Sequence, residues 1–167
     1  SEPDSPPARG LSDHDAARLL AFRDGLRRFL HWSEQQARQA GLTPAQHQLL
    51  LAIRGHPGRP AVGDVVDHLQ LRHHSVVELI DRAERADLVR RVGDDADHRV
   101  VRLELTDEGA RRLADLSAAH LEELSRLRPS FETLWDHLPE DVAEPPVDPA
   151  PDGGDPAPRR SGPEGVG

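Results

Sequence analysis

The stretch that decides the fold is LRHHSVVELIDRAERADLVRRVGDDADHRVVRLELT, residues 71–106, in which the hydrophobic period changes once. Between residues 73 and 88 apolar residues recur at intervals of three and four, which predicts a helix with one buried face. After residue 88, the β-type runs VRRV and VVRLEL flank the turn sequence GDDADHR, which predicts a hairpin over 89–105. The residues expected on the buried face of the helix are Val76, Leu79, Ile80 and Ala83.

Two shorter helices are predicted before this segment. A capping box formed by Thr43 and Gln46 starts the first, which is expected to end at Gly55. The second covers 61–69, and only three residues separate it from the helix over 73–88. A short helix, a tight turn, a second helix and a two-stranded ribbon together predict a winged helix-turn-helix.

Long helices are predicted on both sides of this unit. Ser12 is expected to cap the first, and Gly41 to stop it. Thr106 is expected to cap the last long helix and Pro129 to break it, so that Ser130 begins a short final helix. The fold class expected is mainly α with a small β-hairpin. The apolar residues at helical spacing are Leu19, Phe22, Leu26, Phe29 and Leu30 in the first helix, Leu113, Leu116, Leu121, Leu124 and Leu127 in the last, and Phe131, Leu134, Trp135 and Leu138 in the short one.

The two ends of the chain differ from its middle in composition. Residues 1–11 and 139–167 are rich in Pro, Gly and Asp and contain almost no large apolar residues, so burial cannot offset the entropy lost on ordering them. We expect both to be disordered tails around a folded part at 12–138. Most of the net charge of −9 also lies in the ends, which leaves the middle close to neutral.

Composition excludes several classes of protein. The chain has no cysteine, which removes disulfides, thiolate metal sites and thiol-based redox switches. No apolar run approaches the ~20 residues of a membrane span, and there is no signal-peptide pattern, so a cytoplasmic protein without a membrane contact is expected. Neither a G-x-S-x-G turn, a P-loop nor a G-x-G-x-x-G motif after a strand is present, and we expect neither an enzyme nor a bound cofactor.

The helix over 73–88 and the hairpin carry residues suited to DNA. A major groove admits one α-helix, and arginine and histidine donate to base acceptors or phosphates. Arg99 near the hairpin tip suits the negative potential of a minor groove, and Asp97 is placed to hold its side chain. The acids of the tip would then organise the wing instead of contacting phosphates. The residues expected to face DNA on the helix are Arg72, His73, His74, Ser75 and Val77 near its start, with Arg82 and Arg85 as phosphate contacts further along.

In these features the sequence resembles the MarR family of winged-helix transcriptional regulators. The recognition-helix pattern of that family corresponds to RHHSVVELIDRAE, and its D-x-R wing motif to Asp97-His98-Arg99. The DLV at 87–89 and the Leu105-Thr106 pair before the next helix fit as well, so the likeness covers about 12–128.

The resemblance implies a homodimer that binds palindromic double-stranded DNA, in most members as a repressor. The lobe at 42–106 would bind DNA, and the helices at 12–41 and 106–138 would form the dimer. Release by a small-molecule effector is implied as one form of regulation. Ligands of this family lodge between the dimer helices and the lobe, where the candidates here are His31, Trp32 and His47, although Trp32 fits core packing equally well.

Alternatives to these interpretations stay open at this point. Arg82 and Arg85 could pair with Glu78, Asp81 or Glu84 on their own helix, contributing ~0.3–0.5 kcal/mol per pair. The acidic balance and Glu78 favour a winged helix that contacts only protein. A zinc-responsive regulator is a further alternative, but the ten histidines do not follow the spacing of a zinc motif, and no metal site is predicted.

Overall fold

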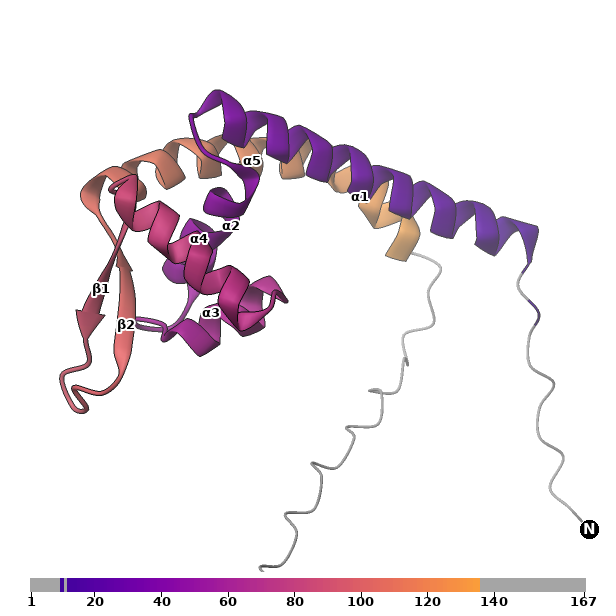
Figure 1. The fold of residues 1–167 in the computed structure, drawn as a ribbon. Helices are drawn as coiled ribbons and strands as arrows, with labels where there is room; N and C mark the ends of the chain where they lie inside the picture. Colours follow the sequence, from indigo (N-terminus) through magenta and orange to yellow (C-terminus); the bar gives the residue numbers. More distant parts are fainter. Residues whose placement is uncertain (1–9, 11, 136–167) are drawn as a thin grey trace, which may run out of the picture. The chain divides into compact units, whose positions relative to one another are not determined.

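A computed structural model describes residue 10 and residues 12–135, with side chains described as far as Glu132. It contains α1 (Asp13–Gln39), α2 (Pro44–Gly55), α3 (Val62–Leu69), α4 (His73–Arg85), β1 (Val89–Gly93), β2 (Val101–Leu105) and α5 (Asp107–Trp135) (Figure 1). The chain is therefore mainly helical with one antiparallel hairpin, which confirms the expected fold class. Apart from residue 10, the expected tails at 1–11 and 139–167 lie outside the described residues, as does Leu138. None of the described helices is both long and apolar enough to span a bilayer.

The helices begin where the sequence predicted. The Ser12 hydroxyl accepts a hydrogen bond from the Asp15 amide at 3.1 Å, which caps α1. Thr43 and Gln46 form the full capping box at the start of α2, with distances of 3.0 and 3.1 Å. At the start of α5 the Thr106 hydroxyl accepts from the Gly109 amide at 3.0 Å. Each cap satisfies an amide that the helix itself leaves without a partner.

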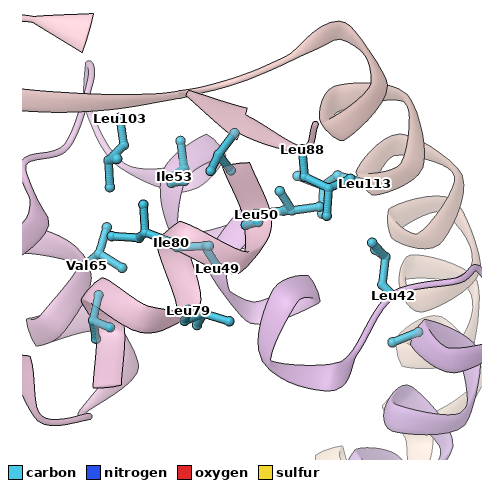
Figure 2. Close-up of a cluster of buried hydrophobic side chains, with 14 of the residues drawn as sticks. Leu42, Leu49, Leu50, Ile53, Val65, Leu79, Ile80, Leu88, Leu103 and Leu113 are labelled. Atoms are coloured by element: carbon cyan, nitrogen blue, oxygen red, sulfur yellow. The ribbon is translucent and has the colours of Figure 1, made fainter. Parts of the chain in front are cut away.

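The winged-helix lobe, which we define as α2, α3, α4, β1 and β2, has one apolar core (Figure 2). Helices α2 and α4 supply most of it, and Leu103 of β2 points into it because alternate strand residues face the same side. The core continues to α5 through Leu113 and Leu116. The fully buried large side chains are those of Leu49, Leu50, Ile80, Leu88, Leu103, Val65, Val76 and Val89, together with Pro60.

The hairpin has a third, shorter partner. Val89 pairs with Leu105 and Gly93 with Val101, so the two strands are in full register. Ala61 also forms a bridge with Arg102, and the amide of Leu103 donates to the carbonyl oxygen of Pro60 at 2.9 Å. The wing is thereby attached to the start of α3 as well as to the end of α4.

A close backbone contact joins α4 to α5. The predicted helix over 73–88 ends earlier, at Arg85, because the chain turns at Asp87, whose φ is +54°. The carbonyl oxygen of Leu88 then accepts from the amide of Thr106 at 3.1 Å. A Cβ atom on Gly109 would lie 2.0 Å from that same oxygen, so this position in α5 requires glycine.

The expected break at Pro129 is wrong. Helix α5 runs through Pro129 to Trp135, and no separate helix starts at Ser130. A proline inside a helix removes one backbone hydrogen bond, but tertiary packing can hold the helix together across it. Here the ring of Phe131 packs edge-on against Phe22 of α1, with centroids 5.7 Å apart, which keeps the last turns of α5 alongside α1.

Candidate nucleic-acid interface

The start of α4 is an open surface. Arg72, His73 and His74 are exposed, and Ser75 and Val77 are half-buried. Arg72 is the N-cap residue but its side chain makes no capping hydrogen bond, and the first turn contains no acid. The amides and the positive dipole end of α4 are thus available to an anion, in contrast to the capped and acidic first turn of α5.

Further along α4, the two arginines do not pair with the acids of their own helix. Arg82 is exposed and has no ion pair within the described part of the chain. Arg85 is also exposed and donates from Nε to the backbone oxygen of Asp81 at 3.2 Å. The alternative in which Arg82 and Arg85 are neutralised by their helix neighbours is therefore wrong.

Two of those acids, Asp81 and Glu84, pair instead with Arg91 of β1. Its Nη2 atom donates to Asp81 Oδ1 at 2.7 Å, and its Nη1 atom contacts Glu84 Oε2. Its backbone amide donates to Glu84 Oε1 at 3.1 Å. Arg91 therefore fastens the wing to α4 and leaves Arg82 and Arg85 without an ion pair among the described residues, a role that spacing along one helix could not reveal.

The wing tip confirms the predicted pair of Asp97 and Arg99. Arg99 donates to Asp97 Oδ1 from Nε at 3.1 Å and to Oδ2 from Nη2 at 3.2 Å. The Arg99 side chain is nevertheless 91% exposed, so the guanidinium is oriented without being buried. The hydrogen bond from Arg99 is the main cause that lowers the pKa of Asp97 below its usual value.

Asp94 organises the rest of the tip. Its Oδ1 atom accepts from the amides of Ala96 and Asp97 at 2.8 and 2.9 Å, and its Oδ2 atom from Arg102 Nε at 2.7 Å. The Arg102 hydrogen bond is the largest of several that lower the pKa of Asp94. Asp94 and Asp97 are thus engaged within the wing, as the sequence predicted, whereas Asp95 is exposed and forms no ion pair with the described residues.

Two further acids of the lobe differ in whether they form an ion pair. Glu104 contacts Arg90 and lies 2.9 Å from Arg59 Nε. Glu78 on α4 is exposed and has no ion pair among the residues described. The charges in the middle of the chain nearly cancel in sum, but they are unevenly distributed over the surface. Cations without an ion pair are exposed on α4, and most of the nearby carboxylates pair with other arginines.

The ligand candidates fall into two groups. Trp32 and His47 meet at His120 of α5, with ring centroids 4.9 and 4.8 Å from that imidazole. His31 is exposed instead and contacts Gln35 on its own helix at 3.2 Å, so it does not join them. No spacing in the sequence indicated His120 as part of this cluster, because it lies on a helix far along the chain from Trp32 and His47. Among the described residues there is no group of three or more His, Asp or Glu side chains that could hold a metal ion.

The sequence of the lobe is similar to that of known regulators. Residues 40–100 match the model of the MarR family. The chain is 35% identical over 69 residues to the HTH-type transcriptional repressor MdtR of Bacillus subtilis, a match that covers 41% of this chain and 44% of MdtR. The chain thus spans less than half the length of this relative.

Solved structures of MarR-type proteins share the fold. AbsC, a MarR family transcriptional regulator from Streptomyces coelicolor, superposes with a TM-score of 0.60 at 22% identity, over 78% of this chain and all of AbsC. The transcriptional repressor CouR, solved with a 23-mer DNA duplex, gives a TM-score of 0.57 at 24% identity, over 70% of this chain and 85% of CouR. Residues 40–100 are thus similar to the MarR family, and the described helices and hairpin share the fold of its solved members.

Proposed function

We propose that the chain binds double-stranded DNA through α4 and the wing and represses transcription as a homodimer. The observation that carries this proposal is the state of the arginines. Arg72 and Arg82 are exposed with no ion pair among the described residues, and Arg91 pairs with Asp81 and Glu84, the carboxylates next to Arg82. Arginine fits phosphates and guanine edges, and phosphate contacts provide most of the affinity for DNA.

Each part of the surface has its own role in this proposal. The first turn of α4 enters the major groove, where Arg72, His73, His74, Ser75 and Val77 meet bases and phosphates. Arg82 and Arg85 contact the backbone. Arg99, held by Asp97, reaches the minor groove beside it. The names of MdtR and CouR as repressors support the regulatory function, and neither is named as an enzyme.

The homodimer in this proposal uses α1 and α5. Both helices leave large apolar side chains exposed along their length, and a second copy of the same surface would cover them. Two-fold symmetry then places the two α4 helices about one turn of DNA apart, as a palindromic site requires. Release by a small-molecule effector, which the family resemblance implies, stays a prediction. The exposed leucines are Leu19, Leu20, Leu26 and Leu30 of α1 and Leu121 and Leu124 of α5.

A mobility-shift titration on duplex DNA from upstream of the chain's own gene, at two salt concentrations, tests the proposal. We expect Arg99→Ala to weaken binding to many sequences and to reduce the slope of log affinity against log salt by about one. Substitution of Arg72 or His74 by alanine is expected to change sequence preference instead. Arg126→Ala is the matched control, because Arg126 is an exposed arginine on α5 that pairs with Glu123 at 2.9 Å.

Two results would contradict the proposal. Wild-type protein that gives no competitor-resistant shift at either salt concentration would favour a winged helix that contacts only protein, for which exposed Glu78 is the supporting feature. Equal losses for Arg99→Ala and Arg126→Ala would remove the minor-groove role from Arg99.

A further inference from the structure

A part-buried hydrogen bond between His120 and Ser33, with the His47 ring packed against it, lies where α2 meets α1 and α5. His120 of α5 contacts Ser33 Oγ of α1 through Nε2 at 2.6 Å, and its Nδ1 atom lies 2.8 Å from the carbonyl oxygen of Leu116. His47 of α2 packs against the same imidazole, with ring centroids 4.8 Å apart. We call Trp32, Ser33, His47 and His120 the histidine junction.

The two histidines differ in how they can hold a proton. Nδ1 of His120 donates to the Leu116 carbonyl, so in the neutral ring Nε2 accepts from the Ser33 hydroxyl. When His120 is protonated, the hydroxyl can rotate and accept from Nε2–H instead. His120 therefore has hydrogen-bond partners in both protonation states.

His47 has no such arrangement. Its residue is only 4% exposed, and its ring makes no hydrogen bond with any described residue. A proton on His47 would add an N–H donor without an acceptor and a charge beside His120. Burial is the main cause that lowers the pKa of His47 below its ordinary value, and His120 is the second.

No charged group offsets this cost among the described residues. From α1 the junction receives Trp32 and Ser33, which are uncharged, and from α5 it receives His120. Helices α3 and α4 and strand β2 also pack against α2, but none of them contributes a charge that acts on His47. A protonated His47 can be stabilised only by water, which its ring nitrogens reach at the edge of the junction because they are not fully buried.

The position of His47 links this event to α4. Helix α2 carries His47 toward α1 and α5, and places Leu49, Leu50 and Ile53 in the core that it shares with α3 and α4. A packed core moves as a unit, so α2 cannot withdraw from α1 and α5 without moving α4 with it. We propose that proton uptake by His47 loosens the histidine junction and lowers the affinity for DNA, an inference that rests on the proposed DNA-binding function.

The direction of the pH dependence follows from the lowered pKa. In the packed state His47 binds a proton less readily than a free histidine, so the packed state is favoured above about pH 6.5 and loses that advantage as the pH falls through the lowered pKa. Substitution of His47 therefore isolates this effect from those of the other histidines.

Fluorescence anisotropy with a labelled duplex from the chain's own upstream region, at pH 7.5 and 5.5 and constant ionic strength, tests the inference. Between these pH values, we expect the dissociation constant of the wild-type protein to rise about fivefold more than that of His47→Phe, because only the wild-type protein can take up the proton. Phenylalanine keeps a ring against His120 but cannot titrate, and His47→Leu serves as the second variant if phenylalanine overfills the site. His31→Phe is the matched control, because His31 is exposed on α1 outside the junction.

A second readout needs no DNA. The chain has two tryptophans, so Trp135→Phe leaves Trp32 as the single emitter. We expect the emission maximum of Trp32 to move to longer wavelength on acidification as water enters the junction, and to move less when His47 is also replaced. Equal pH responses of the wild-type protein and both His47 variants, in anisotropy and emission, would overturn the inference while leaving the proposed function intact. Absence of DNA binding by the wild-type protein at pH 7.5 would instead overturn the proposed function and its regulation together.

Discussion

The winged-helix lobe and the pair of long helices, α1 and α5, differ in what they leave at the surface. On α4 and at its N-cap the exposed groups include cations without carboxylate partners, Arg72 and Arg82, together with Glu78, which has no ion pair among the described residues. On α1 and α5 the exposed groups include leucines along both helices, with Leu30 55% exposed. The first surface suits a polyanion, and the second suits an apolar surface such as another copy of itself.

The two regions also differ in how much of their apolar surface is buried. The lobe buries most of its large apolar side chains in a core that continues into α5, and its wing is fixed to α4 by Arg91. Helices α1 and α5 contact each other through rings, such as Phe22 against Phe131, yet much of their apolar surface stays open. The helix pair therefore has more to gain from association than the lobe.

The largest expected effect comes from breaking the contact that joins the two regions. Gly109→Ala places a methyl group 2.0 Å from the carbonyl oxygen of Leu88, so the backbone at the start of α5 must shift. We expect the free energy of unfolding to fall by about 3 kcal/mol, as overpacking against a fixed group does. Urea unfolding followed by circular dichroism measures it.

Gly63→Ala is the matched control for this change. A Cβ on Gly63 of α3 would meet nothing within 4 Å, and alanine favours helix, so stability should stay equal or rise by about 0.5 kcal/mol. If both substitutions changed stability by the same amount, the close approach at Gly109 would not be what joins α4 to α5.

The next largest effect distinguishes the exposed leucines of α1 from an exposed leucine of the lobe. Leu30→Glu places a carboxylate on the exposed face of α1, where burial against a second copy would leave the charge without a partner. We expect the dimer dissociation constant to rise at least about tenfold, measured by sedimentation equilibrium. Leu51→Glu changes an equally exposed leucine, at 47%, on α2 of the lobe and should leave the dimer intact. Dissociation by Leu51→Glu and not by Leu30→Glu would move the dimer interface to the lobe.

Sequence patterns predicted the parts of this molecule that depend on nearby residues. Helix caps at Thr43 and Thr106 were recognisable because the residues that form them lie within three positions. The pair of Asp97 and Arg99 was recognisable for the same reason, since a single residue separates them on a turn. Local geometry fixes such contacts before tertiary structure forms.

What the sequence did not reveal depends on contacts between distant segments. Arg91 and Glu84 are on different elements, so no helical spacing indicated that β1 takes the acids of α4. Pro129 has the local features of a helix end, but the packing of Phe131 against α1 carries the helix past it. His120 belongs to the histidine junction only because α1, α2 and α5 meet there in the folded chain, which no local spacing indicates.

The smallest expected effect concerns the charges at the start of α5, next to the turn between α1 and α2. Glu108 accepts hydrogen bonds from Arg111 and Arg112, and these lower its pKa from 4.5 to about 2. Arg112 also donates to the carbonyl oxygen of Gly41 at 3.3 Å, which links α5 to that turn. The folded chain binds a proton at Glu108 less readily than the unfolded chain, so the carboxylate stabilises the fold above pH 4.5 and loses this effect as the pH falls toward 2.

We therefore expect Glu108→Gln to lower the free energy of unfolding slightly near neutral pH and to converge with the wild-type protein as the pH falls below 4.5. The effect is small because solvent screens an exposed pair. Urea unfolding between pH 7 and 3 measures the difference, and Asp115→Asn, which removes a 3.3 Å contact to Arg111, is the control. Because the window lies well below that of His47, a difference that instead disappears near pH 6 would mean that Glu108 acts through the histidine junction and not through Arg111 and Arg112.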